Sequence, residues 1–158
     1  MTAASQNKTE TPASASDSSP PANEEHVFVL VVDDDESVLA TTRAILESVG
    51  FAPILAHSGE EALEIYQMGK DGGYPAPLVL LDLTLPGGMN GLETFEALKK
   101  LDPAVRAIAT SGYFDESAAQ AAKRRGFMGI LPKPFTAERL VKLVQWSSSK
   151  SVEPAEAA

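Results

Sequence analysis

The chain has 158 residues, of which 44% are hydrophobic, a length and composition typical of one soluble globular domain. Its formal net charge of −9 argues against direct binding to nucleic acid, which needs a basic face to contact phosphates. The absence of cysteine excludes disulfides, thiolate metal sites and cysteine nucleophiles, and no apolar run is long enough to span a membrane. We therefore expect a cytoplasmic protein with neither a nucleic-acid nor a membrane partner.

The two ends of the chain differ in composition from its middle. Residues 1–25 are rich in Ser, Thr, Pro and Ala and contain no Val, Ile, Leu or aromatic residue. Such a segment cannot bury enough apolar surface to offset the entropy lost on ordering. Residues 147–158 begin with a serine run and end in alanines. We predict disordered tails at 1–25 and 147–158, and one folded domain at 26–146.

Five short apolar runs predict β-strands, and they alternate with segments whose apolar residues recur at helical spacing. In chain order the runs are residues 27–32, 51–56, 78–81, 105–109 and 128–131. Pro53 lies in the second run and Pro132 follows the fifth. Because proline cannot donate to a β-ladder, both runs should be edge strands. The prediction is an α/β fold: a flavodoxin-like, doubly wound, five-stranded parallel sheet of order 2-1-3-4-5 with five helices.

The predicted helices each follow one of these strands. Their apolar stripes cover residues 38–49, 62–66, 92–98, 117–125 and 140–146. Gly50, directly after the first stripe, is a typical C-terminal cap. Ser58 with Glu61 three residues later predicts a capping box at the start of the second helix.

Charged and hydroxyl side chains follow the predicted strands where each strand ends. Strand 1 runs into Asp33 and Asp34, strand 3 into Asp82, strand 4 into Thr110 and strand 5 into Lys133. In an open α/β sheet the functional site lies beyond the carboxyl ends of the strands, so these side chains should converge. Carboxylates about 4 Å apart repel by about 4 kcal/mol at an effective dielectric of 20, so a cation is needed there. Oxygen ligands without His or Cys predict Mg²⁺.

Asp82 is the most informative of these residues. An acidic run that precedes a helix, such as Asp35 and Glu36, is explained by the helix dipole alone. That explanation does not cover Asp82, which follows four apolar residues and precedes Leu83, a costly place for an unpaired charge. With Lys133 and Mg²⁺ the three aspartates form a neutral site, which would tolerate a phosphoryl group of charge about −2.

Four fragments of the sequence resemble the signatures of response-regulator receiver domains, the CheY-like phosphoacceptors of two-component signalling. They are residues 30–34, 80–86, 109–112 and 131–135, in the order and spacing of that family. The resemblance implies that Asp82 accepts a phosphoryl group from a phosphohistidine on a histidine kinase or a histidine phosphotransfer protein. It implies a signalling protein rather than an enzyme, one that catalyses only its own phosphorylation and dephosphorylation.

The same resemblance implies a role for each residue around Asp82. Asp34, Asp82 and the backbone carbonyl of Thr84 would bind Mg²⁺ directly, and Asp33 would help to hold the metal and its waters. Lys133 would pair with one oxygen of the phosphoryl group.

The Thr110 hydroxyl would move to bond another phosphoryl oxygen. This shift would repack the surface formed by helix 4, strand 5 and helix 5, which would contact a downstream protein.

Two features depart from the commonest family pattern. Ile130 stands three residues before Lys133, where the family often has an aromatic switch residue. This leaves open how the Thr110 movement is read out. The loop at residues 86–91 is one residue longer than usual and, together with residues 111–113, resembles receivers attached to hybrid sensor kinases.

Three other functions fit parts of the sequence. A flavin-binding protein would share the fold, but it needs a phosphate loop rich in glycine and hydroxyl groups after strand 1, where this chain has aspartates. An aspartate-nucleophile phosphatase needs a second Asp two residues after the nucleophile, where this chain has Thr84. A degenerate receiver that only binds partners would not need the complete set of acids, Thr and Lys.

The distance from the domain to the end of the chain bears on its output. A dozen residues follow Trp146, too few for an output domain. We therefore expect a stand-alone receiver that acts by protein contact, or one that relays the phosphoryl group to a histidine phosphotransfer protein.

Overall fold

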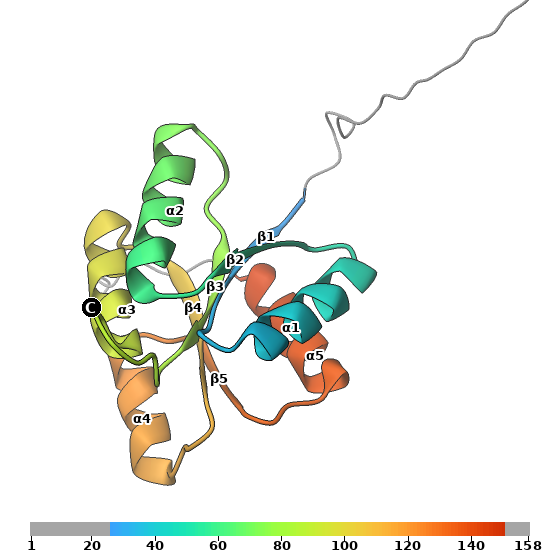
Figure 1. The fold of residues 1–158 in the computed structure, drawn as a ribbon, viewed down its shortest axis with the longest axis vertical. Helices are drawn as coiled ribbons and strands as arrows, with labels where there is room; N and C mark the ends of the chain where they lie inside the picture. The colour runs from blue at the N-terminus through green and yellow to red at the C-terminus, as the bar shows by residue number, and fades with distance from the viewer. Residues whose placement is uncertain (1–25, 151–158) are drawn as a thin grey trace, which may run out of the picture.

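The computed structural model describes residues 26–150, in which five strands and five helices alternate along the chain (Figure 1). The strands are β1 (Phe28–Val32), β2 (Ala52–Ala56), β3 (Leu78–Asp82), β4 (Arg106–Ser111) and β5 (Gly129–Pro132). The helices are α1 (Glu36–Ser48), α2 (Gly59–Asp71), α3 (Gly91–Leu101), α4 (Glu116–Arg125) and α5 (Ala137–Ser148). None of the helices in this part of the chain has the length and apolarity needed to cross a membrane.

All five strands are parallel and pair in the order β2-β1-β3-β4-β5. Pro53 lies in β2 and Pro132 ends β5, so both prolines are on edge strands as predicted. The order and the parallel direction confirm the predicted flavodoxin-like fold. They place β3 in the centre of the sheet, where every one of its five residues is buried.

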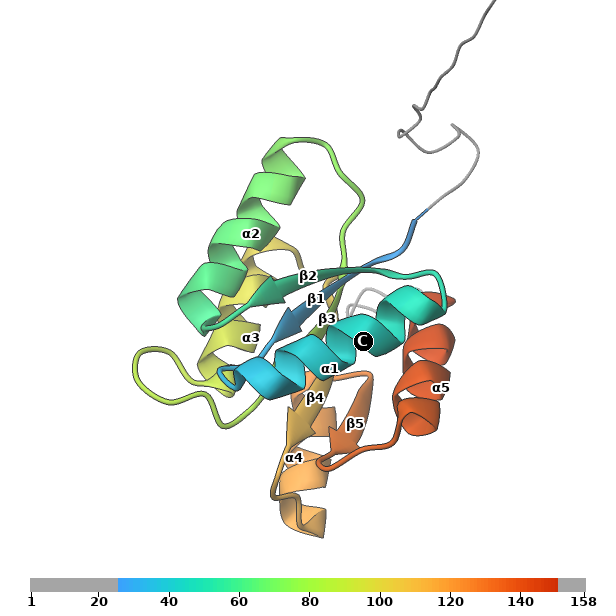
Figure 2. The same ribbon diagram turned by 45° about the vertical axis from the view of Figure 1, so that its right-hand side comes forward.

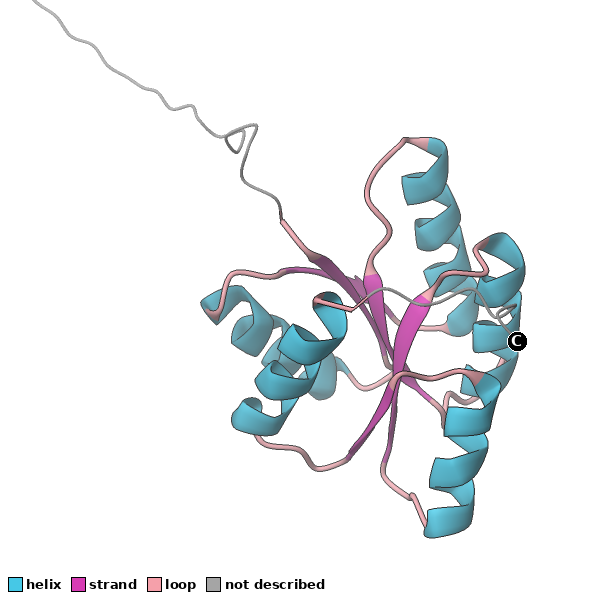
Figure 3. Ribbon diagram, turned by 180° about the vertical axis from the view of Figure 1, so that it is seen from behind, coloured by secondary structure: helices cyan, strands magenta, loops and turns pink. Residues whose placement is uncertain are grey.

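Helices cover both faces of the sheet and bury a separate apolar cluster on each (Figure 3). In β1, Val29 and Val31 point to the cluster under α1 and α5, two helices that lie side by side in Figure 2. Leu30 and Val32 point to the cluster under α2, α3 and α4. A strand covered on both faces needs apolar residues at successive positions, which explains why its sequence shows no polar alternation.

The C-terminal boundary of the domain lies further along the chain than predicted. Helix α5 continues through Ser147 and Ser148, and Ser147 is fully buried. Ser147 follows Leu140 and Val144 on the buried stripe of the helix, so a small polar residue occupies a core position that composition alone does not reveal. The tails predicted at 1–25 and over most of 147–158 lie outside the described residues.

The start of α2 differs in part from the predicted capping box. The Ser58 hydroxyl accepts from the backbone N–H of Glu61 at 3.0 Å, as expected for an N-cap. The Glu61 carboxylate, however, accepts from the backbone N–H of His57 at 2.7 Å, one residue before the cap. A reciprocal capping box is formed at α3 instead, by Asn90 and Glu93.

The second half of α2 is tied to the loop between α3 and β4. The buried Tyr66 hydroxyl donates to Asp102 at 2.8 Å, and burial, with the adjacent carboxylate, raises the pKa of Tyr66, so the hydroxyl stays a donor. This hydrogen bond joins residues 36 positions apart in the sequence. It therefore contributes to tertiary packing rather than to the helix itself.

Replacing Tyr66 with Phe is expected to lower the free energy of unfolding by about 1.5 kcal/mol, because it removes one hydrogen bond to a charged group while keeping the ring. Urea denaturation measures the change. Tyr74→Phe is the matched control, since Tyr74 is 66% exposed and should give no measurable loss. Equal stability of the two variants would contradict the role assigned to Tyr66.

His57 bridges the first turns of α1 and α2 and should make stability depend on pH. Its ring nitrogens lie 3.2 Å from Glu61 and 2.8 Å from Glu36, and these contacts, the Glu61 hydrogen bond foremost, raise the pKa of His57. The stabilisation is therefore complete below the unfolded-state pKa of about 6.5 and is lost as the pH rises through the folded-state value. His57→Gln should remove this pH dependence in urea titrations across that range; identical pH profiles for variant and wild type would refute it.

Candidate functional site

The predicted site residues meet at the carboxyl ends of the strands. Asp33 follows β1, Asp82 is the last residue of β3, and Lys133 follows β5. Thr110 in β4 is the direct neighbour of Asp82 in the sheet register. The topology thus gathers side chains that are up to 100 residues apart in the sequence.

Lys133 connects the two most buried carboxylates. Its Nζ lies 2.7 Å from Oδ2 of Asp33 and 3.1 Å from Oδ2 of Asp82. The Asp33 and Asp82 side chains are 4% and 2% exposed, and that of Lys133 is 20% exposed. The backbone N–H of Lys133 donates to the carbonyl of Ser111, and the following Lys133–Pro134 peptide bond is cis. The contacts of Nζ with Asp33 and Asp82 hold the ammonium group over the end of β3.

The protonation of Lys133 and Asp33 reflects this shared contact. Burial alone would lower the pKa of Lys133, but its hydrogen bonds to Asp33 and Asp82 outweigh burial and raise it, so the ammonium keeps its charge. Burial, assisted by the negative charge of Asp82, raises the pKa of Asp33 in spite of the bonds from Lys133 and from the N–H of Asp35. One lysine therefore does not fully offset the cost of the buried acids.

Three carboxylates offer a place for a metal ion. One oxygen each from Asp33, Asp34 and Asp82 lies within 4.8 Å of the others, and Asp34 is exposed while the other two are buried. These hard oxygen donors without nitrogen or sulfur are of the kind that Mg²⁺ or Ca²⁺ prefers.

Thr84 is fixed directly beside Asp82. Its backbone N–H and its hydroxyl both donate to Oδ1 of Asp82, at 2.9 and 2.8 Å. Oδ1 is thus occupied by Thr84, whereas Oδ2 faces Lys133. The use of the Thr84 carbonyl as a metal ligand stays a prediction.

The other strand-end residues have distinct environments. Thr110 is buried between Asp82 of β3 and Leu131 of β5 in the sheet register. Ser111 uses its hydroxyl to accept from the N–H of Tyr113 at 3.1 Å, so it holds the loop that follows β4. Ile130 is half-buried and packs on the cluster beneath α2, α3 and α4.

Gly91, the first residue of α3, is needed for this geometry, and the sequence analysis did not identify it. A Cβ at this position would lie 2.4 Å from the Asp82 carbonyl oxygen and 2.5 Å from Cα of Leu83. Glycine therefore lets α3 begin directly against the end of β3. The Asn-Gly pair at a helix start was the available signal, but it does not say what the glycine faces.

The comparison with protein families decides what this arrangement is. The model of the response regulator receiver domain matches residues 29–145. The chain belongs to this family. The resemblance stated from four sequence fragments is confirmed, and the domain is a signalling module of the two-component type.

Individual relatives agree with this assignment. A putative NtrX-like response regulator of Rickettsia bellii is 35% identical over 120 residues, covering 75% of this chain and 24% of that protein. The receiver domain of NtrX from Brucella abortus superposes with a TM-score of 0.69 at 31% identity, covering 78% of this chain and 99% of that structure. CheY in a CheX–CheY–BeF3–Mg complex from Borrelia burgdorferi gives a TM-score of 0.70 at 26% identity, covering 76% and 87%. This chain spans about a quarter of the length of the NtrX-like regulator.

The balance of charge at this site predicts that Asp33→Asn affects stability oppositely with and without metal. In metal-free buffer at neutral pH the variant should be more stable than wild type, because ionised Asp33 destabilises the fold above its raised pKa. In Mg²⁺ wild type should be the more stable of the two. It gains about 2.7 kcal/mol when free metal is a hundredfold above Kd, whereas the variant lacks one of the three carboxylates and gains less.

Urea unfolding in EDTA and in Mg²⁺ measures both differences. Asp71→Asn on the exposed end of α2 is the control and should behave like wild type in both buffers. A variant at position 33 that is less stable than wild type in EDTA would contradict the charge argument.

Proposed function

We propose that this receiver domain accepts a phosphoryl group onto the Asp82 carboxylate from a phosphohistidine of a histidine kinase or a histidine phosphotransfer protein. The observation that carries the proposal is the position of Asp82. It ends the central strand, its Oδ2 lies 3.1 Å from Lys133, and two further aspartates lie within 4.8 Å. A buried carboxylate with a lysine on one side and acids on the other suits a charge-neutralised phosphoryl transfer.

In the proposed reaction an oxygen of Asp82 attacks the phosphorus atom and forms a P–O bond. The P–N bond to the donor histidine breaks, and its electron pair returns to the imidazole. Lys133 would move its hydrogen bonds from the free carboxylates to a phosphoryl oxygen. Thr110, next to Asp82 in the sheet, would donate its hydroxyl to another phosphoryl oxygen.

Magnesium is the proposed cofactor. When bound, it would supply the positive charge that the acceptor carboxylate and the phosphoryl oxygens need during transfer. Asp34, Asp82 and the Thr84 carbonyl would hold it directly, and Asp33 would hold it and its waters. The oxygen-only donor set supports this choice, and the similar CheY from Borrelia burgdorferi was crystallised with Mg and BeF3.

The proposed output is contact with a downstream protein through the face formed by α4, β5 and α5. Thr110 lies opposite Leu131 of β5 in the register, so a movement of Thr110 acts directly on that strand. The proposed setting is the cytoplasm, where a kinase presents its phosphohistidine. The CheY structure in complex with CheX is an example of such protein contact in a similar domain.

Incubation of the full chain with a small phosphoryl donor such as acetyl phosphate and Mg²⁺ is expected to label the protein once. EDTA should prevent labelling, and Asp82→Ala should abolish it because the nucleophilic oxygen is gone. Intact-mass spectrometry measures the incorporation, and peptide mapping locates it.

Asp71→Ala is the matched control, an exposed aspartate outside the site that should leave labelling unchanged. Persistent labelling of Asp82→Ala would overturn the assignment of the acceptor. Continuous hydrolysis of p-nitrophenyl phosphate at many turnovers would favour a phosphatase instead.

A further inference from the structure

The loop between β3 and α3, residues 83–90, is anchored by a side chain from another helix. We propose that the carboxylate of Glu60, in the first turn of α2, is a positioning residue for this loop and thereby for Thr84 and the metal site. The inference rests on the proposed function, since it concerns the same Mg²⁺ site. It adds a residue outside the strand ends to that site.

The contact between Glu60 and the loop is specific. Oε2 of Glu60 accepts from the backbone N–H of Met89 at 2.9 Å. Gly87 and Gly88 both have positive φ, 66° and 32°, which turns the chain sharply in front of Glu60. A Cβ on Gly88 would lie 2.5 Å from Oε2 and 3.0 Å from Oε1 of Glu60. The carboxylate therefore lies directly against the glycine turn.

The two ends of the loop are held by other means. At its start Thr84 bonds to Asp82, and Leu85 is buried. At its end Asn90 caps α3, and Gly91 packs against the Asp82 carbonyl. Within residues 26–150, the bond to Glu60 is the one hydrogen bond that the structure shows for the middle of the loop, residues 86–89. The conformation between the two anchored ends thus depends on Glu60.

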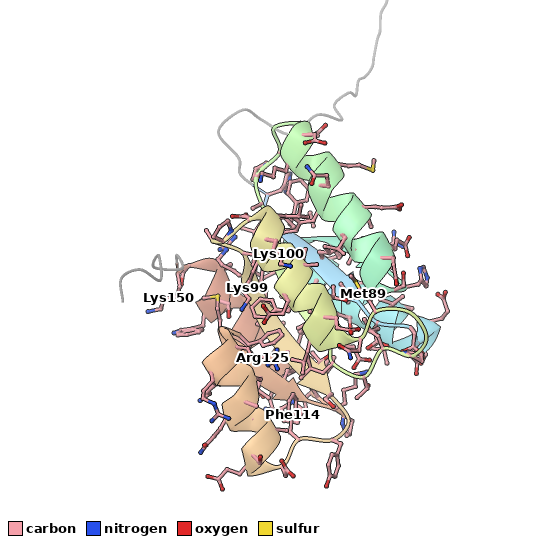
Figure 4. The ribbon with its side chains drawn as sticks, turned by 90° about the vertical axis from the view of Figure 1, so that its left-hand side faces the viewer. Met89, Lys99, Lys100, Phe114, Arg125 and Lys150 are labelled. Atoms are coloured by element: carbon pink, nitrogen blue, oxygen red, sulfur yellow. The ribbon has the colours of Figure 1, made fainter. Side chains whose placement is uncertain are left out.

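The backbone that carries the exposed Glu60 side chain lies close against the loop and α3. The preceding residue, Gly59, approaches α3 so closely that a Cβ would lie 2.0 Å from Oγ1 of Thr94 and 3.2 Å from Cβ of Met89. Ser58 caps the helix in the same turn. Figure 4 shows Met89 in the loop beside this first turn of α2.

A carboxylate suits this position for two physical reasons. The N-terminal turn of a helix favours negative charge, so a carboxylate at position 60 suits the start of α2. A charged acceptor makes a stronger hydrogen bond to a backbone N–H than a neutral one. Thr84 lies two residues before Pro86, where the middle of the loop begins. If residues 86–89 are loosened, the Thr84 carbonyl can change its direction while the Thr84 N–H and hydroxyl stay bonded to Asp82.

Mg²⁺ titrations of the full chain, followed by NMR, test the proposal with Glu60→Ala, Glu60→Gln and Glu64→Ala. Glu60→Ala should bind Mg²⁺ about three- to tenfold more weakly, the range expected for loss of one hydrogen bond. Glu60→Gln removes the same charge but keeps an acceptor, so it should bind more tightly than Glu60→Ala. Glu64→Ala, an exposed acid one turn further along α2, should stay within about twofold of wild type.

Amide hydrogen exchange in metal-free buffer provides a second measurement. Exchange at Met89 should accelerate in Glu60→Ala and not in Glu64→Ala. Accelerated exchange with unchanged Mg²⁺ affinity would overturn the proposal, as would equal affinities of Glu60→Ala and Glu60→Gln. Failure of wild type to bind Mg²⁺, or binding unaffected by Asp34→Asn, would instead show that the metal site itself is misassigned.

Discussion

Asp33 and Asp82 are buried at neighbouring strand ends, where their carboxylates repel each other. The ion pairs of both with the ammonium group of Lys133 offset this repulsion. Lys133 bonds to Asp33 and Asp82 at once, at 2.7 and 3.1 Å. Lys133 follows β5, the edge strand that pairs with β4. Its backbone N–H is bonded to the Ser111 carbonyl at the end of β4, which fixes the point from which the side chain extends. The parallel sheet, the strand order and the edge prolines can all be understood as the frame that brings this cation to these acids.

The fold and the central residues of the site could be predicted because each leaves a local pattern. Fully apolar runs indicate strands covered on both faces, and Pro53 and Pro132 indicate the edges. Asp82 is conspicuous because a charge after four apolar residues needs a partner. Once the strand order is known, topology places Asp33 and Lys133 at the same edge of the sheet, and the length of the lysine side chain lets it reach across β4 and β3 to Asp33.

The contacts that sequence reasoning missed depend on the backbone path at a helix start or on a partner that is distant in the sequence. Glu61 bonds to His57 instead of Ser58, and Glu60 bonds to Met89 in a loop 29 residues away. For Glu60, its place in a first helical turn is fully explained by the helix dipole, so the sequence carries no sign of its second role. For Glu61, a capping contact was expected, but its backbone partner lies one residue earlier than predicted. Ser147 was missed for a related reason, since a small polar residue in a serine run gives no indication of burial.

How firmly each helix packs on the sheet determines which helix can respond to a change at the site. Helix α4 buries Ala122 as its one fully buried side chain among the described residues, so its displacement exposes little apolar surface. Its C-terminal end is nonetheless anchored, because Lys99 of α3 donates to the carbonyl of Arg125, and Phe127 stacks on Phe95 at 4.0 Å. The end of α4 nearest Thr110 is therefore the end with fewer anchors. The proposed movement of Thr110 would therefore act, even without an aromatic at position 130, on a helix that buries little apolar surface of its own.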